Sequence, residues 1–98
     1  MTTTQVGVQK TIIRLLKKES GHGPDMTPFE YEGDIGNSFI YEVSYIKNGK
    51  LVDITMEYFV SHNPDITVLL FVDGDKKLSR RIKPHELGKI MKKIRSTI

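Results

Sequence analysis

The residues of this chain best suited to chemistry are its basic side chains, and they are unevenly distributed. Residues 73–98 hold nine lysines and arginines against three acids, and residues 1–19 hold four against one. Residues 20–72 hold eight acids against two lysines. Lysine and arginine bind phosphate oxygens, and a surface that gathers them attracts polyanions at range. Two basic ends around an acidic middle therefore indicate nucleic acid as the first candidate partner.

The predicted nucleic-acid site lies mainly in the C-terminal third. Its cations would contact about five to eight phosphates, and aromatic rings would offer stacking surfaces for bases. The predicted site residues are Lys76, Lys77, Arg80, Arg81, Lys83, Lys89, Lys92, Lys93, Phe59 and Tyr45. The alternative interpretation is a solvated face that keeps a small protein soluble and protects an edge strand from unwanted pairing.

Two of these residues break the local pattern of their strands. Strict alternation places Arg80 on the apolar side of its strand. There it either pairs with Glu57 or Asp53, or lies at the rim of the sheet and reaches a ligand anion. Phe59 falls on an otherwise polar side. It is either part of a second core, a dimer contact or a platform for a base.

Other kinds of chemistry have little support in the sequence. The chain has no cysteine, which excludes disulfides and thiolate catalysis. Its three histidines are scattered, with no second ligand at metal-binding spacing. We therefore expect no enzyme activity, no cofactor and no metal. The lack of cysteine and of a signal-peptide pattern favours a cytoplasmic location, and the longest apolar run, residues 66–72, is too short to span a bilayer.

The elements that position these side chains follow from hydrophobic periodicity. Apolar residues at helical spacing predict a helix over residues 5–19 and a second that begins at Pro84. Extended segments are predicted at residues 27–32, 38–60, 66–72 and 76–83. The predicted fold class is α+β, with a single antiparallel sheet of four to five strands and both terminal helices on one face. Residues 1–98 are expected to form one domain, flexible at residues 1–4 and in the loop 20–26.

The strongest structural signal is a hairpin around Asn48-Gly49, the preferred pair for a two-residue type I′ turn. This turn fixes the register, because opposed residue numbers must add up to 97. The register then gathers eight apolar and aromatic residues of the two strands on one face, so turn chemistry and patterning agree. The later run of residues 66–72 predicts a central strand that is buried on both faces.

Two stretches carry a resemblance to known families. Residues 82–94 (IKPHELGKIMKKI), with the hairpin around Asn48-Gly49-Lys50, resemble the positive-cofactor-four family of single-stranded-DNA-binding transcriptional coactivators. The resemblance implies a dimer whose curved sheets bind single strands through basic and aromatic side chains. The chain differs from that family in its extra segment 66–72 and its N-terminal helix. The order of helix and strands in the first half is also similar to the double-stranded-RNA-binding domain, but the last helix lacks that family's starting lysine cluster.

The sequence therefore predicts a small nucleic-acid-binding protein, specific for single-stranded DNA or RNA but tolerant of sequence, that acts in transcription or replication as a homodimer. It would bind through the basic strand 76–83 and the C-terminal helix. The alternative is a protein-interaction module, such as a small chaperone-like or inhibitor protein that docks an acidic partner. Both interpretations require the two basic ends of the chain to meet in space.

Overall fold

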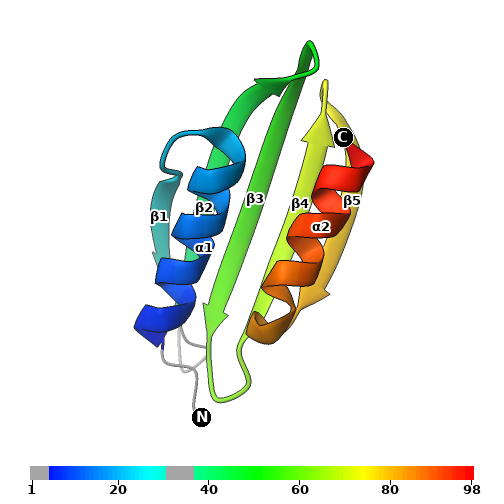
Figure 1. The fold of residues 1–98 in the computed structure, drawn as a ribbon. Coiled ribbons are helices and arrows are strands. Elements are labelled where there is room, and N and C mark those ends of the chain that lie inside the picture. The colour runs from blue at the N-terminus through cyan, green and yellow to red at the C-terminus, as the bar shows by residue number, and fades with distance from the viewer. Residues whose placement is uncertain (1–4, 31–36) are drawn as a thin grey trace.

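The computed structural model describes residues 5–30 and 37–98 as two helices on one face of an antiparallel sheet (Figure 1). The strands form a meander in the order β1-β2-β3-β4-β5. The elements are α1 (Gln5–Ser20), β1 (Asp25–Glu30), β2 (Asn37–Lys47), β3 (Lys50–Val60), β4 (Asp65–Val72), β5 (Asp75–Ile82), the 3₁₀ turn η1 (Pro84–Glu86) and α2 (Leu87–Thr97). The predicted α+β class and element order are confirmed.

The β2–β3 hairpin has the predicted turn and register. Asn48 and Gly49 both adopt positive φ angles, 53° and 76°, as a type I′ turn requires. Lys47 is opposite Lys50, and Tyr45 is opposite Val52, so each pair of residue numbers adds up to 97. The turn therefore fixes which side chains of the two longest strands share a face, and the apolar set among them faces the helices.

The core lies between the sheet and the helices. Val8, Ile12 and Leu16 of α1 are buried against the sheet, and α2 buries its own apolar stripe. The buried residues of α2 are Leu87, Ile90, Met91 and Ile94. The strands contribute alternate residues, as in β4, where Ile66, Val68 and Leu70 are fully buried. One continuous core therefore holds both helices on the same face of the sheet.

The ends of the helices follow local rules. Gly21, with a φ of 87°, ends α1 by donating its backbone N–H to the Lys17 carbonyl at 2.8 Å. Pro84 opens the 3₁₀ turn rather than the α-helix itself. Glu86 accepts a hydrogen bond from the backbone N–H of Lys83 at 3.0 Å, as the glutamate of a capping box does.

Two sequence predictions need correction, and two others lie at least partly outside the described residues. The predicted loop at residues 20–26 is shorter, because β1 begins at Asp25. Strand β4 is next to the edge strand rather than central, and the helices cover only one of its faces (Figure 1). Its outward residues Leu69 and Phe71 are therefore half-buried instead of buried. The prediction for residues 1–4, and the part of the predicted extended segment 27–32 that follows Glu30, fall outside the described residues.

Candidate nucleic-acid interface

On the outer surface of α1 and α2, here called the helix layer, the exposed charged residues are all cationic. The two helices carry eight lysines and arginines, and all eight are exposed. They are Lys10, Arg14, Lys17 and Lys18 of α1 and Lys89, Lys92, Lys93 and Arg95 of α2. The one acid in these helices is Glu19, whose side chain is only 6% exposed. The helix layer therefore presents positive charge to solvent with no exposed acid of its own.

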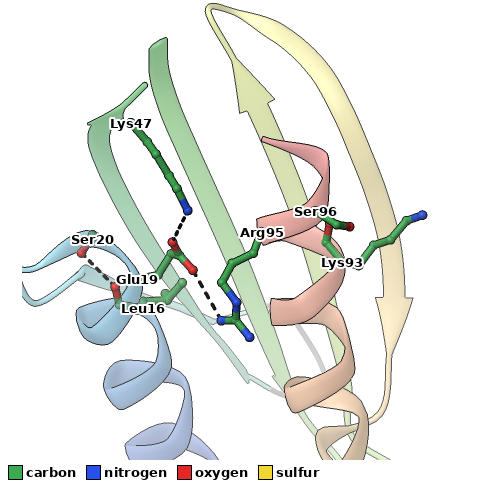
Figure 2. Close-up of polar contacts among 7 residues, drawn as sticks. All are labelled: Leu16, Glu19, Ser20, Lys47, Lys93, Arg95 and Ser96. Atoms are coloured by element: carbon green, nitrogen blue, oxygen red, sulfur yellow. Dashed lines mark hydrogen bonds and ion pairs between the residues drawn. The ribbon is translucent and has the colours of Figure 1, made fainter. Parts of the chain in front are cut away.

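Glu19 links the two helices, and its carboxylate is buried rather than presented to solvent. Figure 2 shows its carboxylate between Lys47 of β2 and Arg95 of α2. Lys47 Nζ lies 3.4 Å from one oxygen, and Arg95 Nη1 lies 3.5 Å from the other. The C-terminal ends of α1 and α2, 76 residues apart in the chain, are thereby linked through one buried carboxylate. The two basic ends of the sequence do meet on one face.

The positions of several cations follow from the helix dipole. Lys17 and Lys18 lie in the last turn of α1, and Arg95 lies in the last turn of α2. Positive side chains are favoured there because the free carbonyls at a helix C-terminus carry partial negative charge. Both helices run in the same direction over the sheet, so these favoured positions share one end of the molecule (Figure 1).

A groove between β5 and α2 extends the helix layer. It has a volume of about 270 Å³ and is lined by Arg80, Lys89 and Lys93, together with Glu86. Figure 2 shows Lys93 extending away from Arg95 toward this side of α2. Arg80 is exposed and lies on the helix face of β5, opposite Val68. Its predicted partners Glu57 and Asp53 lie on the other face of the sheet, so the predicted ion pair is wrong and Arg80 lies at the rim.

The other cations of residues 76–83 do not share the helix face with Arg80. Arg81 is opposite Thr67 and lies on the open face, away from the helices. A bulge between Leu70 and Phe71 also places Lys76 opposite Phe71 on the open face, with Lys77 as the extra residue. Lys83 binds Asp65 at 2.7 Å. The single groove predicted along residues 76–83 is therefore not formed.

The two predicted stacking rings lie on opposite faces of the sheet. Phe59 is on the open face, opposite Asp65, as its pattern predicted. Tyr45 is on the helix face, where it packs against the core and its hydroxyl oxygen is buried. Burial, followed by the neighbouring Glu19 carboxylate, raises the pKa of Tyr45. Tyr45 therefore contributes to the core and is not part of the candidate interface.

The acids gather on the face opposite the helices. By the strand register, the open face of the sheet holds five acids and two cations among the described residues. The acids are Asp25, Glu42, Asp53, Glu57 and Asp65, and the cations are Lys76 and Arg81. These five acids are thus separated from the helix layer by the thickness of the sheet.

The α1 cations are the part of the interface that the predicted site omitted. The charge sum of residues 1–19 already identified them as basic. The α1 cations belong to the interface because α1 packs beside α2 on the same face of the sheet (Figure 1), and how the two helices lie beside each other could not be deduced from the sequence. The described residues contain no cluster of three or more metal-ligating side chains and no helix long and apolar enough to cross a membrane.

Comparison with protein-family models, with curated proteins and with solved structures found no match. The function must therefore be argued from the charges and geometry of this chain.

Proposed function

We propose that this protein binds nucleic acid through its helix layer, with contacts to phosphates rather than to bases. The observation that carries the proposal is the sorting of charge by face, with eight exposed cations on the helices and five acids on the opposite side of the sheet. Such a surface attracts a polyanion and orients the molecule toward it. Arg80, at the groove beside Lys89 and Lys93, extends the surface to the edge of the sheet.

The composition of the helices supports binding that tolerates any sequence. Neither α1 nor α2 contains an aromatic residue that could stack on a base. Phosphate contacts position a protein on nucleic acid and carry no direct sequence information. The proposed role is therefore that of a sequence-tolerant binding protein in transcription or replication.

Charge reversal on each helix tests the proposal. Lys17→Glu on α1 and Lys92→Glu on α2 should each lower the affinity for a mixed-sequence single-stranded DNA by about tenfold. Fluorescence anisotropy measures this, with duplex DNA and duplex RNA as further probes. Lys50→Glu is the matched control, because Lys50 is an exposed lysine at the hairpin turn outside both helices. If all three variants bind like the parent, the helix layer is not the interface.

A second candidate function rests on the apolar residues of α1. Val6 and Ile13 are 57% and 40% exposed and lie on the same outer stripe as Lys10 and Lys17. A stripe that mixes cations with apolar side chains suits an acidic amphipathic protein segment. In that case Ile13→Ser should reduce binding to an acidic peptide, and Lys17→Glu should abolish it. Nucleic-acid binding that survives Ile13→Ser while Lys17→Glu weakens it favours the first function.

A further inference from the structure

The open face of the sheet has an uncharged centre along β4. Six of the seven residues from Ile66 to Val72 are apolar and the seventh is Thr67. Runs of this kind are typical of strands that are covered on both faces. In the single chain the helices cover one face, and no helix or strand within residues 5–30 and 37–98 covers the other (Figure 1). Leu69 and Phe71 therefore stand half-buried on an uncovered surface.

The strands on either side of β4 carry opposite charges at matching positions. Across one row of the open face the register runs from Asp53 on β3, through Phe71, to Lys76 on β5. A second row runs from Glu57 through Thr67 to Arg81. The row between them is uncharged, with Thr55, Leu69 and Ser79. These two rows therefore have an acid on β3 and a cation on β5. A further row joins Phe59 to Asp65 at the start of β4, and the Asp65 carboxylate is paired with Lys83.

This pattern is self-complementary about a two-fold axis that runs along β4. Such an axis lays β4 of one copy on β4 of the other and β3 of each copy on β5 of the other. Asp53 then faces the second copy's Lys76, Glu57 faces the second copy's Arg81, and the two Leu69 side chains meet at the centre. Isologous contacts require this match of a surface with itself, and two sheets packed face to face keep their strands roughly aligned.

We propose that the open face of β3, β4 and β5 is the interface of a homodimer with its two-fold axis along β4. Both helix layers then point outward, so the dimer presents two cationic surfaces. A hollow of about 350 Å³ lies on this face, and Glu57, Thr67 and Arg81 are among the residues that line it. It leaves room for the partner copy's Arg81 side chain beside Glu57. The proposal goes beyond nucleic-acid binding and does not depend on it.

Two single charge reversals and their mixture test the interface. Asp53→Lys alone sets lysine against Lys76 at both contacts of the dimer, and Lys76→Glu alone sets glutamate against Asp53. Each variant should raise the dimer dissociation constant at least about tenfold. In an equal mixture of the two variants, every contact between positions 53 and 76 of a heterodimer again joins opposite charges. A heterodimer should therefore form with nearly the parent's affinity. Sedimentation velocity measures the mass, and native mass spectrometry identifies the heterodimer.

The controls separate loss of the interface from loss of the fold. Ser44, which donates a hydrogen bond to Asp53, is exposed, so Asp53→Lys leaves no buried polar group without its partner. Thermal unfolding of each variant checks this. Lys50→Glu makes the same charge change as Lys76→Glu away from the open face and should leave the dimer intact. A parent protein that stays monomeric, assembles beyond dimers, or gives variants that fail to form a heterodimer would overturn the proposal.

Discussion

Three tyrosines on the helix-covered face keep their hydroxyl groups away from water. Tyr41 and Tyr58 are nearly fully buried, and the Tyr45 hydroxyl oxygen is buried near the Glu19 carboxylate. Burial raises the pKa of all three groups above the ordinary value for tyrosine. At neutral pH these hydroxyls are uncharged in both the folded and the unfolded chain, so their ionisation does not change the free energy of unfolding there.

The shifted tyrosines predict a loss of stability at alkaline pH. Above about pH 10 the unfolded chain loses tyrosine protons that the folded chain retains, so the free energy of unfolding falls as pH rises. Each tyrosine contributes a slope of up to about 1.4 kcal/mol per pH unit until its own folded pKa is reached. Denaturant titrations between neutral pH and about pH 11 measure the slope.

Tyr45→Phe isolates the contribution of one tyrosine to the slope of the free energy of unfolding against pH. The free energy of unfolding of this variant at neutral pH should be close to the parent's, because the buried Tyr45 hydroxyl has no hydrogen-bond partner among residues 5–30 and 37–98. Its slope above about pH 10 should be shallower than the parent's. An identical slope in both proteins would show that Tyr45 ionises as freely when folded as when unfolded.

For single residues, the sequence predicted placement correctly where alternation along one strand decides it. It predicted placement wrongly where the answer depends on how several elements pack together. Alternation along β3 placed Phe59 correctly on the open face. The suggested Arg80 partners were wrong, because whether Glu57 shares a face with Arg80 depends on the register of β3, β4 and β5 together. Tyr45 was assigned to a stacking surface without knowledge of where the helices pack.

The hairpin at Asn48-Gly49 is the element whose geometry the sequence specified most completely. Its two positive φ angles are natural for Gly and tolerable for Asn, but strained for alanine. Gly49→Ala should therefore destabilise the protein by about 1 kcal/mol, although a Cβ at this position would meet no atom within 4 Å.

Gly88 provides the matched comparison. It lies in the first turn of α2, has an ordinary φ angle, and a Cβ there would also meet no atom within 4 Å. Gly88→Ala should raise stability by about 0.4–1 kcal/mol, since it restricts the unfolded chain without strain in the folded one. Thermal unfolding of Gly49→Ala and Gly88→Ala measures the change in stability at each position. A stabilising Gly49→Ala would contradict the type I′ assignment.

Elements with weaker local signals were predicted less well. The apolar run of β4 indicated burial on both faces, and within the part of the chain that the structure describes the helices cover one face (Figure 1). If the proposed dimer forms, that prediction describes the assembly rather than the isolated chain. The bulge opposite Leu70 and Phe71 has no glycine or proline to mark it in β5, so the shift of Lys76 onto the open face was not foreseeable.

At the scale of the whole molecule, the sorting of charge along the chain becomes a sorting of charge by face. The sequence showed two basic ends and an acidic middle, and the fold places both helices on one side of the sheet. Glu19, the one acid in the helices, is used as a buried link between them rather than as a surface charge. The convergence of the two ends required the fold, because no local pattern relates residue 19 to residue 95.

The salt dependence of nucleic-acid affinity tests the central claim most directly. With about five to eight phosphate contacts, the logarithm of the association constant for a mixed-sequence single-stranded DNA should fall linearly with the logarithm of salt concentration, with a slope of about −3.5 to −5.5. Lys17→Glu should make that slope shallower by about 0.7 or more, and Lys50→Glu should not change it. A slope near zero, or a slope that Lys17→Glu leaves unchanged, would contradict a phosphate-binding helix layer.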